Sequence, residues 1–252
     1  MECHRAVSLV VLVLLLRWPA LSSVGASVSR TITVDSKGGG DFRSVQSAVN
    51  FVPDGNREWV RIHVRAGSYR ENVTIPSEKG FILLEGDGSG KTDISFGNYA
   101  HGSIHDLMPR GGIIVTDAMG LNTHNAVDKS NMTQALAALV NGDRIAFHGC
   151  AFTGFQDTLC DKTGWHYFRE CFIEGGVDFI FGYARSIYDG CTVVSNMPLY
   201  SQQPGWVTAH ARVHPGDPCG FVFKGGQVRG TGSQYLGRAW NQYARPQSST
   251  TM

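Results

Sequence analysis

The second half of the chain repeats one short pattern, and this repeat limits the folds that the sequence can adopt. Each copy has an aromatic residue, a cysteine three positions later and an apolar residue two positions after the cysteine. Three full copies are Phe147–Phe152, Phe168–Ile173 and Tyr188–Val193, which start 21 and 20 residues apart. Segment Phe221–Val228, which lacks the cysteine, is interpreted as a fourth copy after a longer insertion. Periods of about 20 to 50 residues are typical of solenoids and other repeat folds.

The segments around these copies are short, apolar and interrupted by glycine, which indicates strands joined by turns rather than helices. Glycine accounts for 31 of the 252 residues and only 17% of residues are charged, a composition that favours a turn-rich β fold over disorder. The net charge of +1 gives no reason to expect a nucleic acid or an anionic membrane as a partner. The sequence therefore predicts an all-β fold, a right-handed parallel β-helix built as a single-stranded solenoid.

The N-terminal half is consistent with the start of such a solenoid. Apolar residues at helical spacing between Asp41 and Val52 predict a short helix that caps the open end. Segments 59–64 and 81–85 alternate or run apolar as strands do.

Residues 1–26 read as a secretory signal peptide. Arg5 precedes an apolar run from Val7 to Leu16, and small residues follow up to Ala26. That run is too short to span a bilayer. We expect a secreted chain with a β-helix domain at 27–245 and a disordered tail at 246–252.

Export to an oxidising compartment favours disulfide bonds. Five cysteines follow the signal peptide, and because none forms a Cys-x-x-Cys pair, no metal site is expected. In a solenoid, residues one period apart stack on neighbouring coils, so the spacing favours a Cys171–Cys191 disulfide, with Cys150–Cys171 or a ladder of free buried thiols as alternatives. Asn72 and Asn131 each begin a glycosylation triplet.

The same period aligns two acids and two amides. Asp157 and Asp178 are 21 residues apart, and Gln134 lies 22 residues before Gln156. Two adjacent carboxylates cannot both ionise freely, which yields one protonated acid and one carboxylate, while neutral amides suit a developing oxyanion. A retaining glycosidase could also use two such carboxylates, and the residues could instead be ordinary turn and ladder residues of a β-helix surface.

Five ordered segments, spread over about residues 31 to 245, resemble the motifs of the pectin methylesterases, especially the plant enzymes. They are Gly67–Glu71 (Gly-Ser-Tyr-Arg-Glu), Gln134–Leu139 (Gln-Ala-Leu-Ala-Ala-Leu), Gly154–Leu159 (Gly-Phe-Gln-Asp-Thr-Leu), Gly175–Gly182 (Gly-Gly-Val-Asp-Phe-Ile-Phe-Gly) and Leu236–Trp240 (Leu-Gly-Arg-Ala-Trp). The resemblance implies the same right-handed parallel β-helix. Because the family usually continues well beyond the last motif, we expect a form truncated at the C-terminus.

The resemblance also implies a role for each residue of the candidate site. Asp178 would attack the methyl-ester carbonyl of galacturonate, and Asp157 would act as general acid and then as general base. Gln134 and Gln156 would stabilise the oxyanion, and Arg238 would pair with Asp178. Residues Phe155, Phe181 and Trp240 would line the sugar-binding groove.

The expected activity is therefore de-methylesterification of cell-wall homogalacturonan by a monomer, without a metal or organic cofactor, with a proteinaceous inhibitor as a second partner. One rival hypothesis is a catalytically inactive, truncated β-helix that binds pectin or another partner. A second is a pectate lyase or another polysaccharide-cleaving β-helix; such lyases usually require Ca²⁺ held by clustered carboxylates and a basic residue that abstracts a proton.

Overall fold

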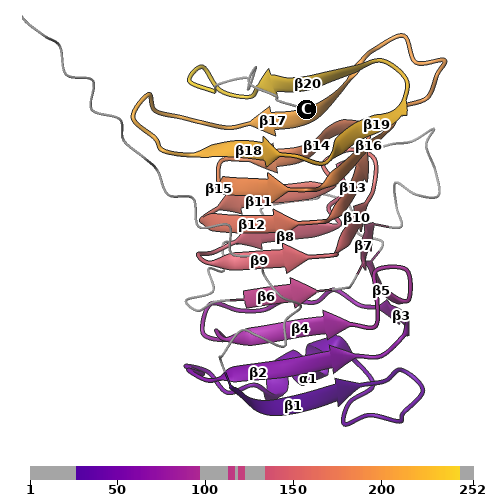
Figure 1. The fold of residues 1–252 in the computed structure, drawn as a ribbon, viewed down its shortest axis with the longest axis vertical. Coiled ribbons are helices and arrows are strands. Elements are labelled where there is room, and N and C mark those ends of the chain that lie inside the picture. Colours follow the sequence, from indigo (N-terminus) through magenta and orange to yellow (C-terminus); the bar gives the residue numbers. More distant parts are fainter. Residues whose placement is uncertain (1–26, 97–112, 117–118, 123–133, 245–252) are drawn as a thin grey trace, which may run out of the picture.

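The computed structural model describes residues 27–96, 113–116, 119–122 and 134–244 (Figure 1). Strands make up 51% of the described residues and helix 4%. The predicted signal peptide, the tail at 246–252 and Asn131 lie outside the described residues, so these expectations stay predictions.

The strands form three parallel sheets, here called A, B and C. Sheet A comprises β1 (Val28–Val34), β2 (Trp59–Val64), β4 (Ile82–Gly86), β6 (Ile113–Thr116), β9 (Ile145–His148), β12 (Trp165–Arg169), β15 (Arg185–Asp189) and β18 (Gly220–Lys224). Sheet B comprises β3 (Gly67–Arg70), β5 (Thr92–Phe96), β7 (Met119–Asn122), β10 (Ala151–Thr153), β13 (Phe172–Gly175), β16 (Thr192–Asn196) and β19 (Gln227–Thr231). Sheet C comprises β8 (Ala138–Asn141), β11 (Leu159–Thr163), β14 (Val177–Gly182), β17 (Gly205–His210) and β20 (Gln234–Ala239).

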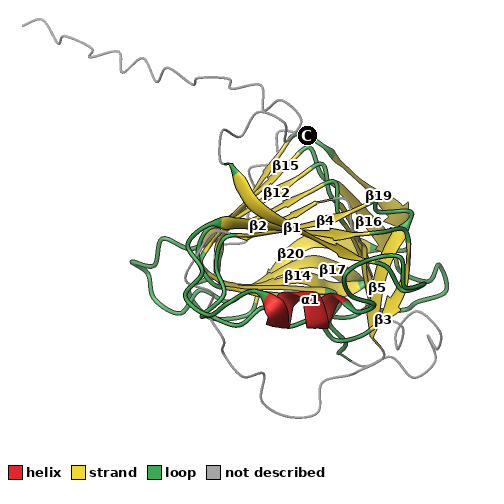
Figure 2. Cartoon of the chain, turned by 90° about the horizontal axis from the view of Figure 1, so that it is seen from below, coloured by secondary structure: helices red, strands yellow, loops and turns green. Residues whose placement is uncertain are grey.

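From β6 onward, each coil of the chain supplies one strand to each of sheets A, B and C, whereas strands β1 to β5 belong to sheets A and B alone. The coils stack along one axis (Figure 1). Seen along that axis, the three sheets enclose a common interior (Figure 2). The predicted right-handed parallel β-helix is therefore confirmed.

A short helix, α1 (Val45–Phe51), packs against β1 and β2 at the first end of the stack (Figure 1). Ser44 caps it by accepting the backbone N–H of Ser47, and the Glu71 carboxylate accepts the N–H groups of Val45 and Gln46 at 2.8 and 2.9 Å. These bonds satisfy donors that a helix N-terminus leaves without intrahelical partners. The predicted capping helix is present.

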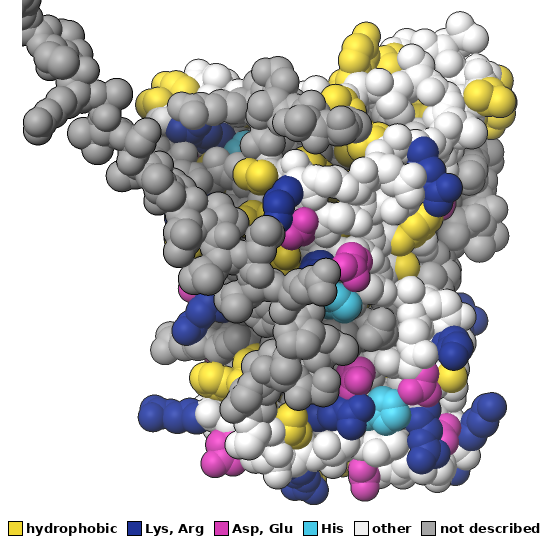
Figure 3. Space-filling view, in the orientation of Figure 1, with side chains coloured by type: hydrophobic (Ala, Val, Ile, Leu, Met, Phe, Trp, Pro, Cys, Tyr) yellow, Lys and Arg dark blue, Asp and Glu magenta, His cyan; other side chains and the backbone are white. Residues whose placement is uncertain are grey.

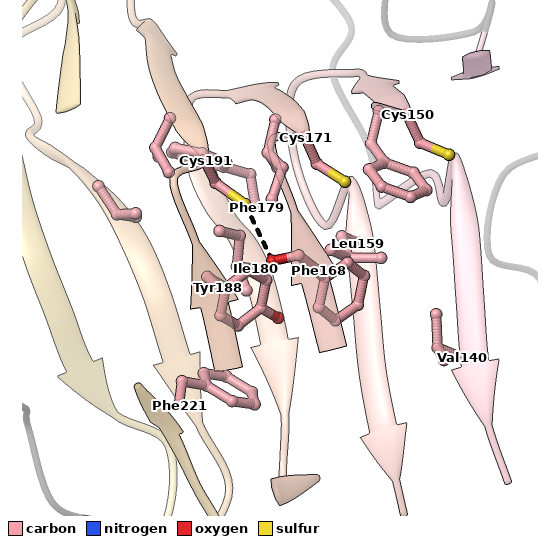
Figure 4. Close-up of a cluster of buried hydrophobic side chains, with 14 of the residues drawn as sticks. Val140, Cys150, Leu159, Phe168, Cys171, Phe179, Ile180, Tyr188, Cys191 and Phe221 are labelled. Atoms are coloured by element: carbon pink, nitrogen blue, oxygen red, sulfur yellow. Dashed lines mark hydrogen bonds between the residues drawn. The ribbon is translucent and has the colours of Figure 1, made fainter. Parts of the chain in front are cut away.

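The sequence repeat corresponds to a ladder of aromatic rings, and its two fully buried members, Phe168 and Tyr188, are seen in Figure 4. Phe147, Phe168, Tyr188 and Phe223 are in register on four coils, with ring centroids 5.1, 4.6 and 4.7 Å apart. The proposed fourth copy was misaligned by two residues, since Phe223 rather than Phe221 continues the ladder. Parallel in-register pairing explains why the period of the sequence predicts contacts in space.

The predicted Cys171–Cys191 disulfide is wrong, because none of the five described cysteines forms a disulfide. Cys150, Cys171 and Cys191 stand directly before β10, β13 and β16, and their sulfurs point the same way (Figure 4). In-register side chains of parallel strands lie about 4.8 Å apart, whereas a disulfide requires Cβ atoms about 3.8 Å apart. The Sγ atoms of Cys171 and Cys191 instead contact the carbonyls of Arg169 and Phe168, each at 3.4 Å.

The surface has no strong overall charge pattern in the view of Figure 3. On the part of this face formed by described residues, Lys and Arg side chains lie among Asp and Glu. Asn72 is exposed, as a glycosylation site must be. Within the described ranges, no helix has the length and apolar character needed to cross a membrane.

Candidate active site

Sheet C carries the two acids that the sequence period aligned. Asp157 lies two residues before β11 and Asp178 is the second residue of β14. The backbone N–H of Asp157 donates to the Val177 carbonyl at 3.0 Å, which places the two acids at equivalent positions on adjacent coils. Both have left-handed backbones, with φ of 61° and 49°. Such conformations are unfavourable for residues other than glycine, and they cluster at functional sites.

Arg238 reaches Asp178 from β20, the last strand of sheet C. Its Nε and one terminal nitrogen donate to the two carboxylate oxygens at 2.7 and 2.5 Å. The Asp178 side chain is only 10% exposed, so its carboxylate is largely shielded from water, whereas the Arg238 side chain of this bidentate ion pair is 37% exposed. The hydrogen bonds to Asp178 raise the pKa of Arg238 above its usual value. Asp178 is therefore held in one orientation by a permanent cation.

Asp157 has the electrostatic environment of a general acid. Burial and, to a smaller extent, the negative charge of Asp178 raise its pKa from 3.8 to about 7, while the positive charge of Arg238 opposes the rise. Asp157 thus holds a proton at mildly acidic pH while Asp178 is paired with arginine. The two neighbouring carboxyl groups can supply a proton donor and a nucleophile at the same time.

The two glutamines lie close to the acids along the backbone of neighbouring coils. Gln156 immediately precedes Asp157 and forms an isolated parallel bridge with Val177. Gln134 is exposed, and the next residue, Ala135, donates its N–H to the Gln156 carbonyl at 3.2 Å. The backbone therefore places both glutamines on adjacent coils, next to the pair of acids.

The three aromatic residues expected to bind sugar differ in accessibility. Trp240 is 51% exposed, and its ring packs 5.7 Å from that of Phe181, which is 8% exposed. Phe155 is only 3% exposed, because its ring lies against Gly176, where an added Cβ would be 2.4 Å from the ring. Trp240 can offer a ring face to a ligand, whereas Phe155 supports the turn before Asp178.

Sequence reasoning missed a second aromatic pair beside Arg238. The rings of Trp206 on β17 and Tyr235 on β20 stack at 6.2 Å, and the Arg238 guanidinium lies 5.9 Å from the Trp206 ring. Trp206 falls after the long connection that follows β16, where the 20-residue period is interrupted. Tyr235 directly precedes the Leu236–Trp240 motif, which is the signal that could have identified it.

The described residues contain no group of three or more His, Cys, Asp or Glu side chains arranged to hold a metal ion. The geometry of the site is thus a pair of carboxyl groups, an arginine, two amides and a rim of aromatic rings on one sheet.

Comparisons with a family model and with individual known proteins all point to the same family. The Pectinesterase family model matches residues 31–250. The chain is 39% identical to "Probable pectinesterase 29" of Arabidopsis thaliana, a match that covers 85% of this chain and 66% of that relative. It is 38% identical to "Pectinesterase QRT1" of the same plant, over 87% of this chain and 60% of the relative.

The fold agrees with solved structures of the same group. The pectin methylesterase from carrot superposes with a TM-score of 0.77 at 31% identity, covering 86% of this chain and 71% of the carrot chain. The pectin methylesterase from Aspergillus niger gives a TM-score of 0.73 at 26% identity, covering 85% and 73% of the respective chains. The chain thus spans 60% to 66% of the length of the two Arabidopsis relatives. By family model, sequence identity and fold, the chain belongs to the pectinesterase family.

Proposed function

We propose that the protein is a carboxylic ester hydrolase that converts methyl-esterified homogalacturonan and water into pectate and methanol. The observation that carries this proposal is the pairing of Asp157, whose pKa is raised to about 7, with Asp178, which Arg238 holds by two hydrogen bonds. Membership of the pectinesterase family supports the same reaction.

In the first half of the reaction, an Asp178 oxygen attacks the ester carbonyl carbon. The carbonyl oxygen becomes an oxyanion, which the side-chain amides of Gln134 and Gln156 stabilise by hydrogen bonding. When the intermediate collapses, the bond to the methoxy oxygen breaks and Asp157 gives its proton to the departing methanol. The product is an anhydride between Asp178 and the galacturonate carboxyl group.

In the second half, the ionised Asp157 takes a proton from a water molecule as that water attacks the galacturonate carbonyl of the anhydride. The bond to the Asp178 oxygen breaks, which restores the Asp178 carboxylate and the protonated Asp157 and releases a galacturonate carboxylic acid group. This group loses its proton to water, which gives pectate. The cycle consumes one water and produces one methanol. Each residue returns to its starting state, so the reaction requires no oxidant or reductant.

The cellular setting forms part of the proposal. We infer that the protein acts outside the cell, in the cell wall, as a secreted monomer carrying a glycan at the exposed Asn72. A proteinaceous inhibitor would bind over the same face of sheet C as the substrate. Trp240 and Phe181 would contact the apolar faces of the sugar rings.

The test is methanol release from highly methylated pectin by the purified chain, with polymer length followed in parallel. Asp178→Asn keeps the size of the side chain but removes the nucleophile, so methanol release is expected to be lost. Asp189→Asn is the matched control: that carboxylate accepts hydrogen bonds from Tyr167 and Lys224 on sheet A, away from the site. Circular dichroism checks that all three proteins are folded.

Each outcome distinguishes between hypotheses. Release that Asp178→Asn abolishes and Asp189→Asn retains supports the esterase. A folded wild-type chain that releases no methanol would refute it and favour the inactive pectin-binding β-helix. Calcium-dependent shortening of the polymer would favour a lyase instead.

A further inference from the structure

The last strand of sheet C contacts the nucleophile segment at two points. Arg238 is one of them, through its ion pair with Asp178. The other is Gln234, at the start of β20, whose Nε2 donates to the Gly176 carbonyl at 3.0 Å. Strand β17 lies between β20 and β14, so both side chains cross over it.

Gly205, at the start of β17, has no side chain, which leaves room for the Gln234 side chain to pass over this strand. A Cβ at this position would lie 2.5 Å from the Gln234 Oε1 atom and 2.0 Å from the Gly176 carbonyl oxygen. Both distances are too short for any side chain larger than hydrogen. Because Gly176 offers a carbonyl oxygen, only the amide nitrogen of Gln234 can form this bond.

The segment that Gln234 contacts is the turn between β13 and β14, which leads into Asp178. The N–H groups of Gly176 and Val177 both donate to the Phe155 carbonyl, at 2.8 and 3.1 Å, and the Val177 carbonyl accepts the Asp157 N–H. These bonds tie the turn to the preceding coil. The Gln234 bond ties it to the last coil, on the opposite side.

This arrangement bears on the orientation of the nucleophile. Asp178 has a left-handed backbone, with φ of 49°, which the surrounding contacts must hold in place. Small displacements of a reacting group reduce catalysis strongly, because the attacking atom has to approach along a narrow path.

We infer that Gln234 is a positioning residue, which fixes the Gly176–Asp178 segment so that the Asp178 carboxylate faces both Arg238 and the substrate. The inference rests on the proposed function for its catalytic consequence. It does not require Gln234 to touch the substrate.

The decisive variant is Gln234→Met, which keeps the length of the side chain but removes the donor. We expect kcat to fall about tenfold, with KM changed less than about twofold, because the loss affects orientation rather than substrate binding. Gln227→Met is the matched control, since Gln227 also uses its amide in a side-chain hydrogen bond, to Thr192 on the neighbouring strand of sheet B. It is expected to leave kcat unchanged.

A second variant separates positioning from general stability. In Gln234→Glu, a protonated side chain can still donate to the Gly176 carbonyl, whereas an ionised one cannot. The activity of this variant relative to wild type should therefore rise as the pH falls. A Gln234→Met enzyme with wild-type kcat, or a Gln234→Glu ratio that does not vary with pH, would overturn the inference.

A titration keeps the test independent of activity. The carboxyl carbon of Asp157 reports its pKa by NMR, and that pKa depends on the position of the Asp178 charge. Gln234→Met should move the midpoint by at least about 0.3 pH unit, and Gln227→Met should not. If the wild-type chain releases no methanol, the proposed function fails alone and this titration still decides the inference; an unmoved midpoint would then refute it.

Discussion

Replacing Asp157 by asparagine is expected to stabilise the protein at neutral pH and to have little effect near pH 4. Asp157 is 8% exposed as a residue, and the pKa of its carboxyl group rises from 3.8 to about 7 because of burial and the neighbouring charge of Asp178. Between these two values the folded protein binds a proton that the unfolded chain has lost. The free energy of unfolding must therefore decrease as the pH rises through this window.

The magnitude follows from the size of the pKa change. About three pH units separate the folded and unfolded values, and each unit corresponds to ~1.4 kcal/mol, which gives on the order of 4 kcal/mol at pH 7 and above. The amide introduced by Asp157→Asn has no charge to bury at any pH. We compare the free energy of unfolding of the variant with that of wild type at each pH. The advantage of the variant should be about 4 kcal/mol larger at pH 8 than at pH 4.

The assay is urea denaturation of both proteins at intervals between pH 4 and pH 8. Asp143→Asn, at an exposed carboxylate that pairs with Arg144, controls for the exchange of a carboxylate for an amide. A difference between Asp157→Asn and wild type that is constant across this range would refute the assignment of a raised pKa to Asp157, and with it the argument for its role as general acid.

Further predictions concern the chemistry, the core, an interior histidine and the thiols. Methanol release should decline above about pH 7, because Asp157 must be protonated to donate to the leaving group, and a pH–rate profile checks this. Phe168→Ala should lower the free energy of unfolding by about 3–5 kcal/mol in urea denaturation, since this buried ring is stacked on both sides. Burial lowers the pKa of His210 below 6.5, so the unfolded chain binds more protons than the folded protein at mildly acidic pH, and the free energy of unfolding decreases as the pH falls. In urea denaturation, His210→Leu should therefore lose less stability than wild type between pH 7 and pH 5. Peptide mapping without reduction should recover Cys171 and Cys191 as separate thiols, and a linked peptide would contradict the structure.

The regular part of the solenoid could be predicted from the sequence, because there residues one sequence period apart are also neighbours in space. In a parallel β-helix, a residue meets the residue one coil away, so a spacing of 20 or 21 residues predicts a neighbour. This reasoning brought Asp157 and Asp178 together and recognised the repeat that forms the aromatic ladder. It misaligned the last copy by two residues, since the longer connection before β18 removes the fixed spacing.

The sequence spacing of residues could not predict the direction in which their side chains point or how far these side chains extend. Cys171 and Cys191 are on adjacent coils as expected, yet their side chains run parallel instead of facing each other. Phe155 stands in a motif next to the acids, but its ring turns inward against Gly176.

The sequence by itself determined the fold class, the capping helix and the alignment of the acids on successive coils, because these depend on local periodicity and on contacts one coil apart. Only the tertiary structure decided the long reach of Gln234 and Arg238 over β17, the stacking of Trp206 on Tyr235 and the burial that raises the pKa of Asp157. The two long contacts join residues 58 and 60 positions apart, and the pKa depends on how much water the packed coils exclude. Neither quantity is encoded in the repeat, since both arise when irregular connections and side chains of several coils pack together.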